Sequence, residues 1–291
     1  MTPFLTAFSD FIRTQPFRII RLAEVRGDGE ISTFEMTEAN PCQDTYSVAK
    51  TFTMTAVGLL WDRGLLSLDE KLADLFRDEI SPETEKKTDP RWNLVTVEHA
   101  LTHRLGLPGG FLDIDVYDAN EFGDDYLAYT LTYPLAYTPG EDARYSDGAF
   151  YLLSRAAAKK AGTTMDKFLW RELFYPLGFR EMAWSTCPKG HPMGATGLYI
   201  RAEDMVKLGQ IYLSGGLYRG KRILSEEWTR MAMEKEFALD WDGEHRVCFK
   251  GGMFGQKLMI VPGQRRAAAL QAYGADSNVV LNWVRAYGDR D

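Results

Sequence analysis

A serine and a lysine stand three residues apart at the head of an otherwise apolar stretch. Residues 46–61 read "YSVAKTFTMTAVGLLW", with Ser47 and Lys50 as the two polar side chains of interest. In a helix, residues i and i+3 lie on one face, roughly 5–6 Å apart at Cβ. A serine hydroxyl is a weak nucleophile until a neighbouring base accepts its proton. The spacing therefore indicates a candidate activated serine.

The apolar neighbours of the pair favour this chemistry. Burial among Phe52, Met54 and Val57 would lower the pKa of Lys50, because an apolar environment disfavours the charged amine. The backbone N–H of Ser47 at a helix start could bind a developing oxyanion. The alternative is that Ser47 is a helix cap and Lys50 a solvated side chain. The spacing also occurs by chance, so further elements are needed.

Two later segments provide them. "PGEDARYSDGAFYLL" places Tyr145 and Asp147 just before a predicted helix, and "FKGGMFGQKLMIVPG" begins with Phe249 and holds Lys250 on a predicted strand. Ser-x-x-Lys, then a Ser-Asp-Asn or equivalent motif, then Lys-Thr-Gly, is typical of serine β-lactamases and penicillin-binding proteins.

The chain resembles the class C β-lactamase superfamily, which includes DD-peptidases, family VIII carboxylesterases, D-aminopeptidases and amide hydrolases. "LTHRLGLP", "FYPLGFREMAW" and "GATGLYIRAEDMVKLGQIYLSGG" also match in order, so the resemblance spans about residues 40–265. It implies that Tyr145 exchanges protons with the nucleophile and the leaving group. It implies that Lys250 supplies positive charge, on a Lys250-Gly251-Gly252 strand like the family's Lys-Thr-Gly. The N–H groups of Met253 and Ser47 would form the oxyanion hole.

Two positions depart from the family pattern. Asp147 replaces an asparagine whose amide donates to a substrate carbonyl, whereas an ionised carboxylate only accepts. Asp147 either favours the helix start, pairs with Lys50, or selects a substrate that presents a donor; the first two are preferred. Gly251 lacks the hydroxyl that a threonine would offer to a substrate carboxylate. Both changes lower the expected efficiency of β-lactam hydrolysis. His103, in "LTHRLGLP", is expected to be structural.

The elements that must position these residues alternate in type. Helical spacing predicts a helix over residues 4–13, and two β-like runs around residues 27–29 predict a hairpin. Helical patterns dominate the middle of the chain, and three short strands and a helix follow near its end. The predicted fold class is α/β (α+β), an antiparallel sheet built from both chain termini and flanked by helices, plus an inserted mostly helical lobe. The sheet lobe is expected at about 1–42 and 235–291, and the helical lobe at about 43–234.

An acidic and aromatic segment separates two of the motifs. Residues 109–137 read "GGFLDIDVYDANEFGDDYLAYTLTYPLAY". One interpretation is a wall of the substrate cleft, where its carboxylates would favour cationic or neutral substrates. The other is an insertion packed by its own aromatic side chains.

Composition excludes several classes. The 291 residues carry a net charge of −7, which argues against a general nucleic-acid binder. No stretch has membrane-spanning length. The N-terminus lacks the pattern of a signal peptide, which favours a cytoplasmic protein. Cys42, Cys187 and Cys248 are widely spaced, which indicates neither a disulfide framework nor a zinc site.

The motifs together predict a serine hydrolase that acts through an acyl-enzyme on an ester, amide or lactam carbonyl. The expected substrate is a small molecule or a short peptide, and no metal or organic cofactor is required. The alternative is a non-catalytic protein on the same scaffold that binds a peptide or a cell-wall fragment. The sequence indicates neither the physiological substrate nor the oligomeric state.

Overall fold

The computed structural model describes residues 1–287, and its contacts divide the chain into two compact units. The first unit comprises Met1–Thr51, Tyr175–Ala183 and Leu198–Asp291, and the second comprises Phe52–Phe174 and Trp184–Gly197. Helix α2 (Ala49–Trp61) begins in the first unit and continues into the second. The expected helical lobe, at about 43–234, had included residues 43–51, 175–183 and 198–234, which here belong to the unit that holds the main sheet.

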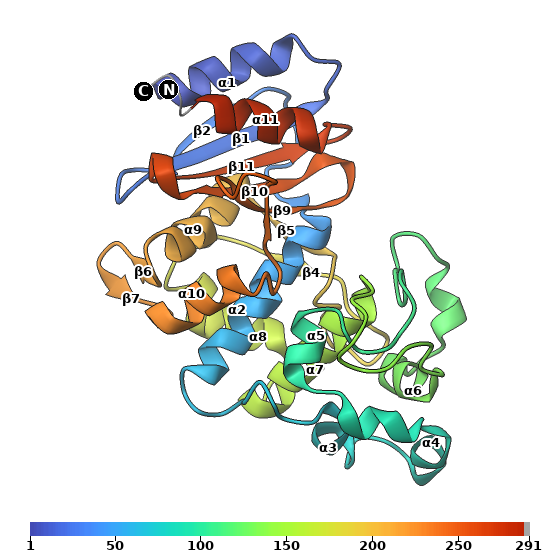
Figure 1. Ribbon diagram of the computed structural model, residues 1–291. Helices are drawn as coiled ribbons and strands as arrows, with labels where there is room; N and C mark the ends of the chain where they lie inside the picture. Colours follow the sequence, from blue (N-terminus) through green and yellow to red (C-terminus); the bar gives the residue numbers. More distant parts are fainter. Residues whose placement is uncertain (288–291) are drawn as a thin grey trace. The chain divides into compact units, whose positions relative to one another are not determined.

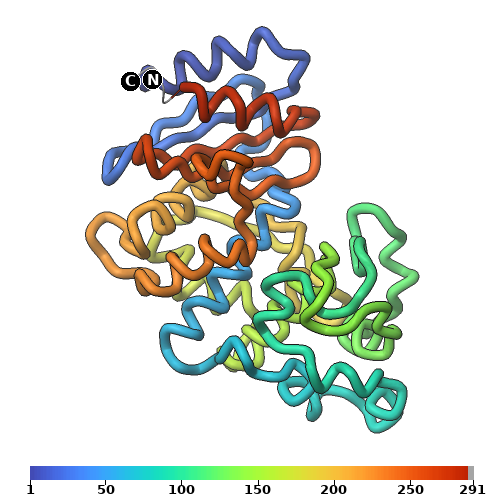
Figure 2. The backbone as a smooth tube through the Cα atoms, viewed as in Figure 1, coloured from blue at the N-terminus to red at the C-terminus, as the bar shows by residue number. Residues whose placement is uncertain are grey.

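The first unit is built on a six-stranded antiparallel sheet. Its strand order is β2-β1-β11-β10-β9-β8, so the first long strand of the chain lies beside the last. Figure 2 shows this as blue and red tubes running side by side. The prediction of an antiparallel sheet assembled from both termini is thereby confirmed. The bounds are β1 (Ile19–Arg26), β2 (Ser32–Glu35), β8 (Asp240–Trp241), β9 (Cys248–Gly251), β10 (Lys257–Val261) and β11 (Arg266–Ala272).

Helices cover both faces of this sheet. α1 (Pro3–Arg13) and α11 (Ser277–Tyr287) pack on one face, and α9 (Ala202–Leu213) packs on the other (Figure 1). The apolar stripe of α1, with Phe4, Leu5, Phe8 and Ile12, is buried as its helical spacing predicts. The core on this side also includes Leu22, Met259, Val261, Leu270, Val280 and Val284.

The second unit is mostly helical. Its central helix is α7 (Asp147–Ala161), which is buried from Asp147 to Ala158 and packs against α3, α5 and α8. It ends at Gly162, which has the left-handed conformation common at helix C-termini. The other helices of this unit are α3 (Leu72–Phe76), α4 (Pro82–Lys87), α5 (Val97–Leu101), α6 (Tyr126–Thr132), α8 (Met165–Leu169), and the short turns η2 (Pro90–Leu94), η3 (Ala119–Phe122) and η4 (Trp170–Phe174).

Short elements complete the chain. They are η1 (Tyr46–Val48), β3 (Gln43–Asp44), β4 (Ala183–Trp184), β5 (Leu198–Ile200), β6 (Leu217–Tyr218), β7 (Lys221–Arg222), α10 (Glu226–Glu234), η5 (Met253–Gly255) and η6 (Pro262–Gln264). β3 pairs with β5, which ties the segment before η1 to the start of α9. Over residues 1–287, no helix combines the length and the apolar character needed to cross a bilayer.

Candidate active site

The predicted serine and lysine are in contact. Ser47 lies in the 3₁₀ turn η1, just before α2 begins at Ala49, and Lys50 lies in the first turn of α2. The Lys50 Nζ donates a hydrogen bond to Ser47 Oγ, with the two atoms 3.1 Å apart. Lys50 is 0% exposed, while Ser47 is partly exposed. The lysine is therefore shielded from solvent, whereas the serine keeps part of its surface exposed.

The residue before the serine has a strained backbone. Tyr46 has a φ of +47°, which is uncommon for a bulky side chain. Its N–H donates to Asp44 Oδ1 at 2.8 Å, a bond that holds the turn in place. Such a conformation costs about 1–3 kcal/mol and persists only where surrounding contacts impose it. The contacts around Tyr46 thus hold the backbone of the turn in which Ser47 lies.

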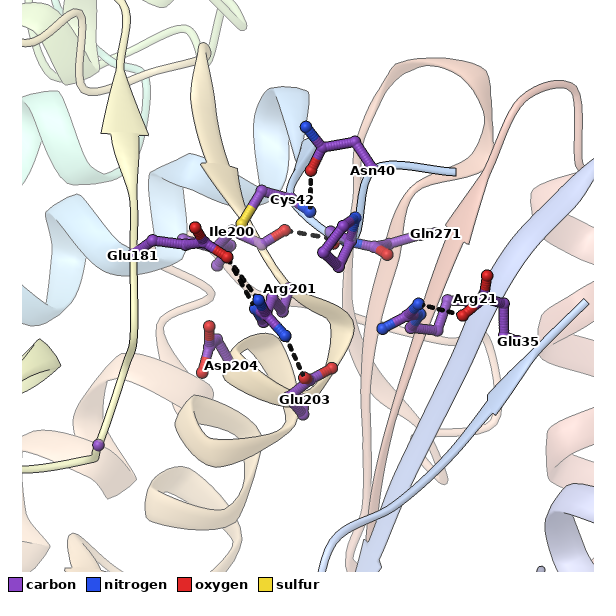
Figure 3. Close-up of polar contacts among 12 residues, drawn as sticks. Arg21, Glu35, Asn40, Cys42, Glu181, Ile200, Arg201, Glu203, Asp204 and Gln271 are labelled. Atoms are coloured by element: carbon purple, nitrogen blue, oxygen red, sulfur yellow. Dashed lines mark hydrogen bonds and ion pairs between the residues drawn. The ribbon is translucent and has the colours of Figure 1, made fainter. Parts of the chain in front are cut away.

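Several bonds anchor the segment that leads to this turn (Figure 3). Gln271 on β11 donates from Nε2 to the carbonyls of Pro41, at 3.2 Å, and Ile200, at 2.9 Å. The N–H and the hydroxyl of Thr45 both donate to the Leu198 carbonyl at 2.9 Å. The segment that precedes Ser47 is therefore hydrogen-bonded to β11 of the main sheet and to β5. Sequence analysis did not foresee Asp44 or Gln271, although an aspartate two residues before a turn residue is a known local signal.

An ion pair lies beside the same segment. Arg201 donates to Glu181 Oε1 from Nε at 3.2 Å, and Figure 3 shows the Cys42 sulfur next to this carboxylate. The hydrogen bond from Arg201 lowers the pKa of Glu181. Burial, followed by the charge of Glu181, raises the pKa of Cys42 to about 11. The thiol therefore stays protonated at neutral pH and is a poor nucleophile.

Strand β9, which carries Lys250, lies close to η1, the turn that carries Ser47 and that we call the nucleophile turn. Lys250 on β9 is 6% exposed, and its Nζ donates to Asp240 Oδ2 at 3.3 Å. Directly after β9, a Cβ placed on Gly252 would lie 2.3 Å from the Thr45 carbonyl oxygen and 3.2 Å from Tyr46 Cβ. Only glycine allows this approach. The structure thus brings the chain around Gly252, the residue before Met253, against the turn that carries Ser47.

Tyr145 lies in the second unit, in the loop before α7, with 46% of its surface exposed. The ring of His103 packs against it, with 4.5 Å between ring centroids. His103 Nδ1 accepts a hydrogen bond from the Ser146 N–H at 3.2 Å. The Tyr145 carbonyl accepts from the Gly110 N–H at 2.8 Å. His103 therefore helps to hold the Tyr145 loop, which agrees with its expected structural role.

Asp147 is the first residue of α7 and is 4% exposed. A negative charge at this end of a helix is favourable, as the first interpretation of Asp147 required. Its carboxylate oxygen lies within 4.8 Å of carboxylate oxygens of Asp113 and Asp115. The start of α7 is therefore strongly acidic.

The acidic and aromatic segment packs on itself. Phe111 stacks on Tyr129 at 5.5 Å and meets Tyr133 edge-on at 4.7 Å between centroids. Phe122 packs against Tyr126 at 5.6 Å. A Cβ on Gly148 would lie 2.7 Å from the Phe111 ring, so this ring covers the start of α7. These contacts are those expected of an insertion packed by its own aromatic side chains.

Comparisons with known proteins show the family of the chain. A profile of the family described as "Beta-lactamase" matches residues 33–284. "Penicillin-binding protein 4" of Amycolatopsis lactamdurans is 27% identical over 284 residues, covering 78% of this chain and 71% of that protein. "D-alanyl-D-alanine-carboxypeptidase/endopeptidase AmpH" of Escherichia coli strain K12 is 22% identical over 262 residues, covering 80% and 65%.

A solved structure shows the same fold. The penicillin-binding protein from Bacillus halodurans superposes with a TM-score of 0.73 at 18% sequence identity, covering 97% of this chain and 99% of that one. At this identity the likeness concerns the fold alone, so residue roles must be argued from the chain itself.

Proposed function

The chain belongs to the Beta-lactamase family, and from that premise we propose that it is a serine hydrolase that acts through an acyl-enzyme on an ester, amide or lactam carbonyl. The observation that carries the proposal is the hydrogen bond between Lys50 Nζ and Ser47 Oγ, 3.1 Å long, in which a fully buried amine meets a partly exposed hydroxyl. A serine becomes a nucleophile when a group in this position accepts its proton.

In the first half of the reaction, Lys50 acts as a neutral amine, so the hydrogen bond is reversed and Ser47 Oγ–H donates to Lys50 Nζ. Ser47 Oγ then attacks the carbonyl carbon while its proton passes to Lys50. The carbonyl π electrons move to the oxygen, which gives a tetrahedral oxyanion. The oxyanion then collapses, the bond to the leaving group breaks, and the leaving group takes up the proton that Lys50 had accepted, which returns Lys50 to its neutral form. In the second half, water attacks the ester formed on Ser47, which releases the acid and regenerates the hydroxyl.

The backbone N–H groups of Ser47 and Met253 are proposed to bind the oxyanion. This assignment is supported by Gly252, whose close approach to Thr45 and Tyr46 brings the chain just before Met253 to the nucleophile turn. Preorganised donors of this kind are each worth about 3–4 kcal/mol of transition-state stabilisation in serine hydrolases.

The remaining roles are proposals that rest on the sequence motifs. Tyr145 would exchange protons with the nucleophile and the leaving group, and Lys250 would supply positive charge near the substrate. Gly251 would offer the substrate no side-chain contact, because it lacks the hydroxyl of a threonine. Asp147 lies at the acidic start of α7, where it would disfavour anionic substrates.

The substrate is proposed to be a small molecule or a short peptide. The relatives named above include a penicillin-binding protein and a D-alanyl-D-alanine-carboxypeptidase/endopeptidase. This chain has Asp147 in place of an amide donor and lacks a hydroxyl at Gly251. We therefore expect slow hydrolysis of β-lactams relative to simple esters or amides.

The deciding experiment is active-site labelling. Incubation with a fluorophosphonate or a labelled penicillin should give one adduct at Ser47, located by mass spectrometry, and no adduct in Ser47→Ala. A protein that takes up neither reagent at Ser47 would be a non-catalytic binding protein on this scaffold. Rates with p-nitrophenyl esters, a chromogenic cephalosporin and D-amino acid amides would then separate the substrate classes.

A further inference from the structure

A row of aromatic side chains runs beside the nucleophile turn. The Tyr46 ring meets Phe254 edge-on, with centroids 5.4 Å apart, and Phe254 stacks on Tyr273 at 4.5 Å. We call these three residues the aromatic row. Phe254 is 38% exposed and Tyr273 is 54% exposed. Stacked apolar rings on a surface are a recurrent feature of ligand-binding sites.

Two residues of the row are sequence neighbours of residues in the proposed reaction centre. Tyr46 immediately precedes Ser47, and Phe254 immediately follows Met253. The row therefore adjoins both the nucleophile and the second proposed oxyanion donor. The Tyr46 and Phe254 rings are in contact, so the two chain segments that carry the proposed reaction centre also meet through this row.

The backbone holds the row in a strained arrangement. Tyr46 and Phe254 both have left-handed φ values, +47° and +59°. The Phe254 carbonyl accepts hydrogen bonds from the N–H groups of Gly274, at 2.7 Å, and Ala275, at 3.3 Å. The Tyr273 N–H donates to the Arg18 carbonyl at 2.7 Å. Strain that is kept in place by several contacts is characteristic of functional positions.

Space is available at the far end of the row. Tyr273 also lines a surface hollow of about 580 Å³ together with Phe17, Ile20 and Met36. Tyr273 is therefore the member of the row that borders open space.

We propose that the aromatic row is a substrate subsite that binds an aromatic ring carried next to the scissile carbonyl. The inference rests on the proposed function and specifies its substrates as aryl or arylalkyl esters or amides. Ring pairs prefer stacked or edge-on contact at the separations that the row already shows, so an incoming ring finds preformed faces and edges.

The first test compares three esters under one assay. Ethyl acetate carries no ring, ethyl phenylacetate carries it on the acyl side, and benzyl acetate carries it on the leaving group. One of the two ring-bearing esters should be favoured in kcat/KM, and this identifies which side binds the row. Phe254→Ala and Tyr273→Ala should lower the preference about 3- to 10-fold, the value of one ring contact.

Three further variants control this result. Phe254→Tyr keeps the ring and should keep the preference, whereas Phe254→Leu keeps only apolar bulk and should lose most of it. Tyr175→Ala removes a tyrosine that is 73% exposed and lies outside the row, and it should change nothing. An unchanged preference in Phe254→Ala and Tyr273→Ala, or an equal loss in Tyr175→Ala, would overturn the proposal.

The second test does not depend on turnover. Phenylacetamide should give saturation-transfer NMR signals from its ring protons with the Ser47→Ala protein, and these signals should fall when Phe254→Ala is added. Acetamide should give none. Binding without hydrolysis of any ester would reject the proposed function and keep the subsite. Hydrolysis without ring binding or ring preference would reject the subsite and keep the function.

Discussion

Gly252 sets how closely the strand that precedes Met253 approaches the nucleophile. Its missing side chain leaves room for the Thr45 carbonyl, which would lie 2.3 Å from a Cβ at this position. At the neighbouring Gly251, a Cβ would meet only Lys257 Nζ at 3.6 Å and Ser277 Oγ at 3.8 Å, which are ordinary contacts. Of the two adjacent glycines, only Gly252 is therefore required by a close contact with the backbone.

Gly252→Ala should lower both stability and reactivity. The clash forces the backbone at Thr45 or β9 to move, at a cost of about 1–3 kcal/mol, and Ser47 labelling should slow at least 10-fold. Gly251→Ala is the matched control and should change both by little. The measurements are chemical denaturation and the rate of fluorophosphonate labelling; equal behaviour of the two variants would contradict the steric argument.

Lys257 is fully buried on β10, and burial lowers the pKa of its amine from 10.5 to about 8. The unfolded chain therefore binds more protons than the folded protein between about pH 8 and pH 10.5. Lys257 therefore lowers the free energy of unfolding of the protein below about pH 8, and this loss disappears as the pH rises from 8 to 10.5.

Lys257→Met should therefore stabilise the protein at pH 7, by about 1–3 kcal/mol. Its advantage over the unmodified protein should shrink as the pH is raised from 8 to 10.5. Denaturation at a series of pH values measures this difference. Lys221→Met, at an exposed lysine on β7, should give a small difference that does not vary with pH. A pH-independent gain in Lys257→Met would show that packing, and not charge, is responsible.

At the scale of residues, spacing was sufficient to pair Ser47 with Lys50, because helical geometry is local. The left-handed backbone of Tyr46 and Phe254 could not be predicted, since neither residue type favours it and tertiary hydrogen bonds impose it. The same holds for the bonds of Gln271 to Pro41 and Ile200, which join segments far apart in the sequence.

Among the elements, α7 carries Asp147 at its first position and depends on a glycine at its end. Gly162 has a φ of +66°, and a Cβ placed there would meet nothing within 4 Å. Its value to the helix is thus conformational and owes nothing to packing.

Gly162→Ala should destabilise the protein by about 1 kcal/mol, because alanine is strained in the left-handed region. Gly243→Ala provides the comparison, since a Cβ there also meets open space but the backbone has no left-handed φ. That variant should be neutral or slightly stabilising. Thermal unfolding of both proteins tests the claim, and a loss in Gly243→Ala equal to that in Gly162→Ala would refute it.

The elements themselves were largely predictable. The helix at residues 4–13, the hairpin around residues 27–29 and the three C-terminal strands were all confirmed. The helix has a clear helical period, and glycines mark the hairpin turn and separate the strands. What sequence could not assign is the partner of α9. An amphipathic helix shows the same pattern whether it covers a sheet or packs against other helices. Gly209 marks the place where α9 lies against β11, because a Cβ there would lie 2.9 Å from Ala267 Cβ. A glycine in the sequence does not by itself indicate such a contact.

For the molecule as a whole, one buried ion pair joins the two ends of the chain. Arg266 on β11 donates from Nε to Glu24 Oε2 on β1 at 2.7 Å, and both side chains are almost fully buried. The guanidinium also lies over the rings of Phe4, 4.2 Å from the centroid, and Tyr287, at 5.2 Å. The Arg266 guanidinium thus contacts α1, α11 and, through Glu24, β1.

Arg266→Met should destabilise the protein by about 3–5 kcal/mol, since it leaves the Glu24 carboxylate buried without its partner. Adding Glu24→Gln to this variant should recover part of the loss. Arg230→Met removes an exposed partner of Glu234 and should have little effect. Urea denaturation of the four proteins measures the series. A double variant less stable than Arg266→Met would argue that the two charges do not act as a pair.

The meeting of α1 and α11 also affects how the chain can be rearranged. The rings of Phe4 and Tyr287 are 5.1 Å apart, although nearly the whole sequence separates them. The two ends of the described chain therefore emerge together on one face of the sheet. A linker between the segments that hold Phe4 and Tyr287 would keep β1 beside β11 if the chain were opened in an exposed loop elsewhere. The order of the strands along the sequence can thus be changed while their order in the sheet is kept, which is the requirement for circular permutation.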